Sequence, residues 1–449
     1  MMKFFLNSFF IFFLTVLSGL LWSSCRDIED TDAQLPQSVA TKEYSATLAR
    51  EWMDMAYNTV RRQGMFALDA SRTYAYTAIA MHECMVHGIS NGRSLAGQLN
   101  GLDALPVPVQ GKQYDWGIVL CHAIPQILAE MIPNMSIESD YIIDAQERSQ
   151  EERLRTRYNI SESVIENSKQ YADALAEALI EWSRSDNRAG LENIVYNPPG
   201  RLGNPQYYIP TTAGAPHFMM PFWWTSRPFV LPSYKFGNVP APYAYSEDPS
   251  SPYYKDVQEV FEATKDPDKV FIGRFWANNP GQSGSPAGSW INIAGQLIEQ
   301  FNIDLPTALR MYTLLAIGTR DGFIACWYQK YLYNLQRPAT FIREAMGHTG
   351  WESPVPTPPY PDYTSGTSTN AGVSSEVLTQ MYGLRPFTDG QHADKGLGVR
   401  QFQHFKQAGI EAYHSRIYAG VHMRRACEMG FRHGEEMGRY IIESLKFTR

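Results

Sequence analysis

The sequence Lys330-Tyr-Leu-Tyr-Asn-Leu-Gln-Arg337-Pro338 is the first of three polar segments in the last third of this 449-residue chain. Its two cations are seven residues apart, which is nearly two helical turns, so a helix would project both from one face. Pro338 is expected to end that helix. Two cations on one face form a clamp suited to an oxyanion. An ordinary exposed basic edge has the same pattern, so this segment alone does not indicate a function.

The second segment is Pro358-Pro-Tyr-Pro-Asp-Tyr-Thr-Ser365-Gly366-Thr367, and a helix is predicted to follow it near Ala371. Backbone N–H groups at a helix start, combined with a glycine and a hydroxyl group, form an anion-binding site. The alternative interpretation is an ordinary helix start rich in serine and threonine.

The third segment is Ser415-Arg416-Ile-Tyr-Ala-Gly420-Val-His422. Arg416 and His422 are six residues apart, which does not place them on one face of an unbroken helix. Gly420 permits a break between two helices, so the two side chains can converge. Arginine supplies positive charge, and histidine can act as a nucleophile or as a ligand. A helix corner with an ordinary polar histidine is the alternative.

In this order, the three segments resemble the type 2 phosphatidic acid phosphatase/vanadium-dependent haloperoxidase superfamily, whose pattern is K-x6-R-P, then P-S-G-H, then S-R-x5-H. The first and third motifs match fully. The proline-rich approach to Ser365-Gly366 is most similar to the soluble haloperoxidase branch, as are Asp321 and Glu411. The resemblance covers about residues 321–439, and the long helices predicted before it are compatible with the same family.

The resemblance implies a helical bundle with a site for phosphate or vanadate. In the family the histidine of the third motif attacks phosphorus or binds vanadium, and the resemblance implies that His422 has this role. Three cations around one site suit an oxyanion and its trigonal-bipyramidal transition state. The residues that this resemblance assigns to the equatorial oxygens are Lys330, Arg337, Ser365, Gly366 and Arg416.

Three positions depart from the family pattern. The acid–base histidine of P-S-G-H is replaced by Thr367, whose hydroxyl group does not titrate near neutral pH, and the proline before the serine is replaced by Thr364. The aspartate often found four residues after the attacking histidine is replaced by Ala426. That aspartate would orient the imidazole. The candidates for a substitute acid that lie nearby in sequence are His348, His404, His414 and Glu411.

These observations lead to three functional hypotheses. The first is a phosphoric monoester hydrolase of the acid phosphatase type, which acts on small phosphorylated substrates through His422 and needs no cofactor. The second is a vanadium-dependent haloperoxidase, in which vanadate is the cofactor and halide and peroxide are the substrates. The third is a non-catalytic lipoprotein that binds phosphate or another ligand on a degenerate scaffold.

The first 24 residues are predicted to be a secretory signal peptide. Lys3 supplies the positive start, the stretch from Phe4 to Trp22 is nearly all apolar, and Cys25 follows two serines. This arrangement resembles a bacterial lipoprotein processing site, in which Cys25 becomes the lipidated N-terminus. An uncleaved membrane anchor is the alternative. Residues 25–40 are predicted to be a tether, so the protein is expected to be exported and membrane-anchored, at the periplasmic face or the cell surface.

The remaining chain is predicted to be all-α. Apolar periodicity predicts helices at 43–62, 67–89, 113–132, 136–158 and 161–185, then at 256–264, 290–301, 306–335, 374–382, 399–416 and 422–445. Residues 187–254 are rich in proline and aromatic residues and are predicted to form a long, packed loop. We expect a multi-helix bundle, with an N-terminal helical region over 41–250 and a C-terminal domain over 251–449 that carries the site.

Composition limits the class of protein. The chain is 44% hydrophobic and 19% charged, which is typical of a globular protein with a large core. Its net charge is −7, and it has no long basic run. A nucleic-acid backbone is therefore not expected as a partner.

Overall fold

The computed structural model describes residues 38–211 and 218–449. Residues 39–449 form one compact unit. The predicted signal peptide, Cys25 and most of the tether lie outside the described residues. Within the described part of the chain, no helix combines the length and the apolar character needed to cross a membrane.

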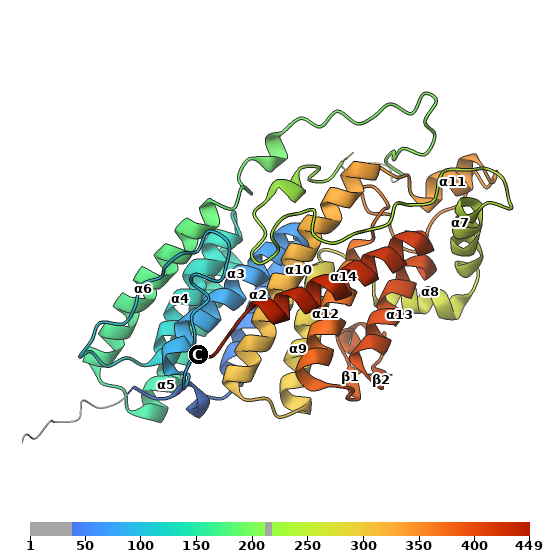
Figure 1. The fold of residues 1–449 in the computed structure, drawn as a ribbon. Helices are drawn as coiled ribbons and strands as arrows, with labels where there is room; N and C mark the ends of the chain where they lie inside the picture. Colours follow the sequence, from blue (N-terminus) through green and yellow to red (C-terminus); the bar gives the residue numbers. More distant parts are fainter. Residues whose placement is uncertain (1–37, 212–217) are drawn as a thin grey trace, which may run out of the picture. The chain divides into compact units, whose positions relative to one another are not determined.

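The fold is all-α, as the sequence predicts, and Figure 1 shows its helices. The first group of α-helices is α2 (Thr47–Arg62), α3 (Ala67–Met85), α4 (Trp116–Met131), α5 (Ile137–Tyr158) and α6 (Glu162–Arg184). The second group is α7 (Pro252–Ala263), α8 (Pro267–Phe275), α9 (Ser285–Gln300), α10 (Leu305–Tyr333), α11 (Pro338–Glu344), α12 (Gly366–Tyr382), α13 (Phe405–Tyr418) and α14 (Arg424–Ser444). The two groups pack on each other inside one unit, chiefly where α10 contacts α3, so they are regions of one compact body.

Helix α10 is the central element. It packs against α3, α12 and α14, and almost every residue from Leu305 to Lys330 is buried. Its start follows from the sequence, because the Asp304 carboxylate accepts a hydrogen bond from the Thr307 N–H at 3.0 Å. The helix also buries three charged side chains, Arg320, Asp321 and Lys330, each at 0% exposure. Buried charges need partners, and the partners of these three lie outside the helix.

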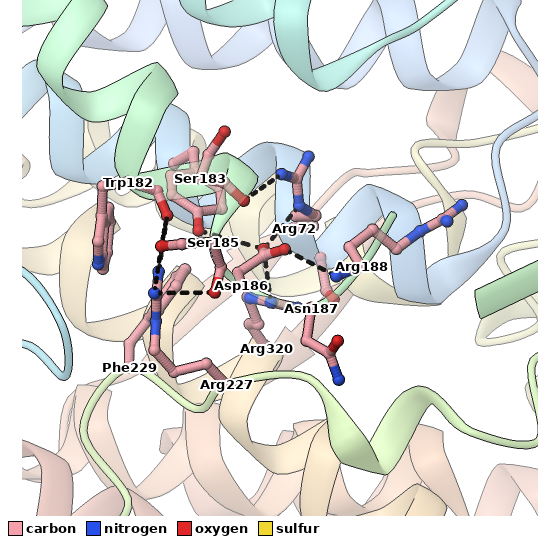
Figure 2. Close-up of polar contacts among 12 residues, drawn as sticks. Arg72, Trp182, Ser183, Ser185, Asp186, Asn187, Arg188, Arg227, Phe229 and Arg320 are labelled. Carbon is pink, nitrogen blue, oxygen red and sulfur yellow. Dashed lines mark hydrogen bonds and ion pairs between the residues drawn. The ribbon is translucent and has the colours of Figure 1, made fainter. Parts of the chain in front are cut away.

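Two of these charges hold the long loop between α6 and α7. The Asp321 carboxylate accepts hydrogen bonds from the N–H groups of Phe229, Val230 and Leu231 at 2.7, 2.8 and 3.0 Å. Figure 2 shows the second anchor, where Asp186 at the start of the loop accepts a hydrogen bond from Arg320 at 2.9 Å. The same carboxylate accepts hydrogen bonds from Arg72 at 2.8 Å and from the Tyr76 hydroxyl at 3.1 Å. The loop is therefore packed against the helices at Asp186 and at residues 229–231, as the sequence predicts.

Several local predictions are wrong. Helix α10 ends at Tyr333 because Asn334 adopts a left-handed conformation, so Lys330 and Arg337 do not share one helical face. Residues 400–402, predicted as helix, form strand β2 (Arg400–Phe402), which pairs antiparallel with β1 (Phe387–Asp389). This pairing buries Phe402 against Phe387. Short helices α8 and α11 and the early start of α12 at Gly366 were not predicted.

We predict that Asp186→Ala lowers the free energy of unfolding by about 3–5 kcal/mol, because it leaves Arg320 buried without its carboxylate. Urea unfolding measures the change. Glu130→Ala is the matched control, since Glu130 pairs with Arg184, whose side chain is 59% exposed, and this loss should stay below about 1 kcal/mol. Equal losses in the two variants would contradict the role assigned to Asp186.

Candidate functional site

The three polar segments meet at one end of α10, although they are far apart in sequence. Lys330 lies in the last turn of α10, and Arg337 immediately precedes α11. Arg416 lies in the last turn of α13, and His422 lies in the turn before α14. Gly420 has φ 77° and interrupts the helical conformation between α13 and α14, as the sequence predicts.

Arg337 is the residue that joins the segments. Its Nη1 lies 3.0 Å from Nε2 and 3.2 Å from Nδ1 of His422. The same nitrogen donates to the Val421 carbonyl at 2.8 Å, and Nε donates to the Tyr360 carbonyl at 2.7 Å. The guanidinium also stacks on the Tyr360 ring, 4.9 Å from its centroid. The side chain is therefore fixed by contacts to the second and third segments.

Lys330 has a different arrangement from the one expected. Its ammonium group donates to the carbonyls of Pro361, Asp362 and Thr364 at 2.8, 3.1 and 2.5 Å. Burial lowers the pKa of Lys330 to about 7, while three acceptors favour the ammonium form, which has three N–H donors. All three donors are used on the backbone. Lys330 therefore holds the turn at 361–364, and it does not present a free N–H to an anion.

The other two cations do present free donors. Arg337 Nη2 and Arg416 Nε and Nη1 are buried and have no hydrogen-bond partner among the residues that the structure describes. Burying such donors without an acceptor is unfavourable by about 1–3 kcal/mol each. An anion at this position would satisfy them, so these residues fit a tetrahedral or trigonal-bipyramidal oxyanion.

The start of α12 adds neutral donors. The Ser365 hydroxyl oxygen caps the helix by accepting from the Ser368 N–H at 3.3 Å and from the Ser368 hydroxyl at 2.8 Å. Its own O–H remains able to donate to an anion. Gly366 is needed for packing, because a Cβ there would lie 3.1 Å from Cε1 of Phe323. Thr367, half-buried, is the second residue of the helix, where N–H groups are free of intrahelical partners.

His422 is buried beside a carboxylate that the sequence analysis did not identify. Its Nδ1 lies 2.8 Å from Oδ1 of Asp362, whose side chain is 0% exposed. Burial, together with the positive charges of Arg337, Lys330 and Arg416, lowers the pKa of His422, so the imidazole is neutral at neutral pH. Burial raises the pKa of Asp362 to about 7, against the opposing effect of Arg337 and Lys330. The only signal for Asp362 was its place in the proline-rich second segment.

The four candidate substitute acids are all engaged elsewhere. His348 stacks on Phe261 with ring centroids 4.2 Å apart. Glu411 forms an ion pair with Arg400 and accepts a hydrogen bond from the Trp276 indole. His404 caps α13, and His414 contacts Arg424 at 3.2 Å. In the described part of the chain, none of them takes the place of the histidine absent at Thr367.

Comparisons with known proteins identify similar sequences and folds. Residues 310–448 match the family described as "VCPO second helical-bundle domain". The structure is similar to that of the first bacterial vanadium-dependent iodoperoxidase, with 30% sequence identity and a TM-score of 0.82, covering 90% of this chain and 97% of that one. It is also similar to a bacterial vanadium-dependent chloroperoxidase in its holo form, with 15% identity and a TM-score of 0.60, covering 85% and 92%. The apo form of a bacterial vanadium-dependent chloroperoxidase gives 15% identity and a TM-score of 0.61, covering 85% and 95%. No curated protein matches the sequence.

We predict that Arg416→Ala weakens the binding of inorganic vanadate by about 1.5–3 kcal/mol, because it removes charge-assisted donors that have no other partner. Isothermal titration calorimetry measures the change. Arg424→Ala is the control, since Arg424 pairs with Glu259 and Glu428 outside the site, and it should leave the affinity unchanged. An unchanged vanadate affinity in Arg416→Ala would contradict the assignment.

Proposed function

The chain belongs to the type 2 phosphatidic acid phosphatase/vanadium-dependent haloperoxidase superfamily, and from this premise we propose that it is a vanadate-dependent haloperoxidase. The observation that carries the proposal is the set of unpartnered guanidinium N–H groups on Arg337 and Arg416, buried next to the neutral imidazole of His422.

The residues present would hold vanadate in the following way. The free donors of Arg337 and Arg416, the Ser365 hydroxyl group and the Gly366 N–H would bind its equatorial oxygens. His422 would bind vanadium through Nε2, which requires a neutral ring. When bound, vanadate supplies Lewis-acid activation of peroxide toward a halide. The two guanidinium groups stabilise negative charge in a site from which water is largely excluded.

Burial of the site favours halide oxidation over ester hydrolysis. Arg337 and Ser365 are 0% exposed, and His422 is 2% exposed. Peroxide and halide ions are small enough for such an enclosed site, whereas a phosphate ester needs space for its leaving group. Hydrolysis also requires an acid that protonates the leaving alkoxide. Thr367 cannot supply that proton. Halide oxidation also consumes one proton, which leaves peroxide as water, but its leaving group is hydroxide and needs no further space in the site. The similarity to an iodoperoxidase makes iodide the halide that we propose.

A phosphoric monoester hydrolase with His422 as its nucleophile is the second candidate. One observation favours it: the neutral imidazole lies beside guanidinium donors that would equally stabilise a phosphoryl transition state. In this case the site would work without vanadate. The third hypothesis is a non-catalytic ligand-binding lipoprotein. It predicts that the protein binds the anion but neither oxidises a halide nor hydrolyses a phosphomonoester.

Two assays on one preparation test the proposal. We expect vanadate-loaded protein to oxidise iodide in the presence of hydrogen peroxide, and we expect the untreated protein to hydrolyse phosphomonoesters poorly. Hydrolysis without halide oxidation would contradict the haloperoxidase proposal. Thr367→His should raise kcat/KM for an unactivated phosphomonoester more than for an activated one, because only the poor leaving group needs a proton. An equal change for both esters would show that Thr367 does not stand in the place of a general acid.

We also propose that the protein is exported and anchored through a lipid on Cys25. The apolar segment before Cys25 and the two serines next to it support this proposal. Metabolic labelling with a radioactive fatty acid should mark the wild-type protein and not the Cys25→Ser variant. Equal labelling of both proteins would contradict lipidation at this residue.

A further inference from the structure

We propose that Asp362 positions the imidazole of His422, and that Lys330 in turn positions Asp362. The inference rests on the proposed role of His422 in binding an oxyanion. It assigns a positioning role to a carboxylate on the second segment, since the position four residues after His422 holds Ala426. It also gives Lys330 a role that is consistent with its contacts.

The first argument is the contact itself. Nδ1 of His422 and Oδ1 of Asp362 are 2.8 Å apart, and both side chains are almost completely excluded from solvent. Both carboxylate oxygens of Asp362 are buried and have no hydrogen-bond partner among the described residues. The last side-chain torsion of histidine is broad, so the ring can turn Nδ1 toward this acceptor. A carboxylate on Nδ1 selects the tautomer with hydrogen on Nδ1. That tautomer puts a lone pair on Nε2, which faces Nη1 of Arg337 at 3.0 Å in this structure and would face phosphorus or vanadium in the occupied site.

The second argument is that the Asp362 backbone is held from both sides. Its N–H donates to the Leu335 carbonyl at 2.9 Å, and its carbonyl accepts from Lys330 at 3.1 Å. Lys330 holds the flanking carbonyls of Pro361 and Thr364 as well. A single ammonium group thus fixes the turn that carries the carboxylate. This role is consistent with the observation that all three N–H groups of the buried Lys330 donate to backbone carbonyls.

The third argument is that the His422 backbone is fixed, which leaves its ring as the variable part. The N–H groups of Val421 and His422 both donate to the Arg416 carbonyl, at 3.1 and 3.3 Å. Gly420 packs so closely that a Cβ would lie 3.0 Å from Pro354. With the main chain held, the ring orientation depends on its neighbours. Arg337 is a donor that approaches both ring nitrogens, at 3.0 and 3.2 Å, and so does not place hydrogen on either. Among the described residues, Asp362 is the one whose carboxylate lies against Nδ1.

Ala426 has a different structural role. Its carbonyl accepts the Ser365 N–H at 3.0 Å, and its side chain is buried in an apolar cluster that includes Tyr253, Tyr363 and Met423. A carboxylate at this position would be buried among these apolar groups. The chain therefore supplies the carboxylate from the neighbouring segment that already carries Ser365.

Nitrogen NMR of protein labelled with [15N]histidine tests the proposal directly. The signals of His422 are assigned by their loss in His422→Gln. In the wild-type protein, at a pH above the pKa of about 7 for Asp362, we expect the neutral tautomer with hydrogen on Nδ1. Observation of the Nε2–H tautomer in the wild-type protein would overturn the proposal, and this result does not depend on whether any variant folds.

Variants then separate positioning from structural support. Asp362→Asn, which is isosteric, should shift His422 away from the Nδ1–H tautomer and weaken the binding of inorganic vanadate by about 10–100-fold. Lys330→Met should change the same two quantities in the same direction. Asp256→Asn is the matched control, because Asp256 is another buried aspartate nearby, and it accepts a hydrogen bond from the Arg425 N–H at 3.0 Å. We expect this control to leave the His422 tautomer and the vanadate affinity unchanged.

The outcomes distinguish this inference from the proposed function. A folded Asp362→Asn protein with an unchanged tautomer and unchanged vanadate affinity would overturn the positioning role. Equal losses in Asp256→Asn would also overturn it, because they would show a general effect of removing a buried carboxylate. If the tautomer shifts as expected while the wild-type protein oxidises no halide, the positioning role stands and the haloperoxidase proposal fails.

Discussion

The burial of charge on α10 is the constraint on which the rest of the structure depends. Arg320, Asp321 and Lys330 are all 0% exposed on one helix. Moving a charge out of water costs several kcal/mol unless other groups replace its hydration. Each of these side chains therefore requires polar partners, and the fold supplies them from segments without regular structure. Arg320 and Asp321 organise the long loop, and Lys330 organises the turn that carries Asp362.

The long loop between α6 and α7 is consequently part of the site's support. Residues Tyr207 and Leu335 form a β-bridge two residues before Arg337. The Met219 carbonyl accepts hydrogen bonds from Tyr331 at 2.8 Å and from the Trp327 indole at 3.4 Å, both on α10. The loop thus holds the end of α10 and the start of the Arg337 segment together. Aromatic residues in its described part pack against α10, as the contact of Tyr196 with Tyr331 shows.

The electrostatic properties of the site follow from its burial. Three cations and one carboxylate lie around His422, and the net positive charge, together with burial, keeps the imidazole neutral. A neutral ring next to free guanidinium donors can bind a vanadium or phosphorus centre whose oxygens carry negative charge. The same burial limits the size of a substrate. The absence of a histidine at Thr367 bears on both reactions, because ester hydrolysis must protonate a leaving alkoxide and halide oxidation by peroxide must protonate a departing hydroxide.

The sequence by itself determined the helical class, the superfamily, and the identities of Arg337, Arg416, Ser365 and His422 as candidate site residues, because apolar periodicity and motif spacing are local properties of the chain. It also indicated the break at Gly420. Only the tertiary structure decided that α10 ends before Arg337, that Lys330 binds backbone carbonyls, and that Asp362 lies against His422. These facts depend on which segments the fold brings together, 60 residues apart in the case of Asp362 and His422. A local sequence pattern cannot predict such a contact. The hydrogen bonds of a buried charged group depend on which groups the folded protein places next to it.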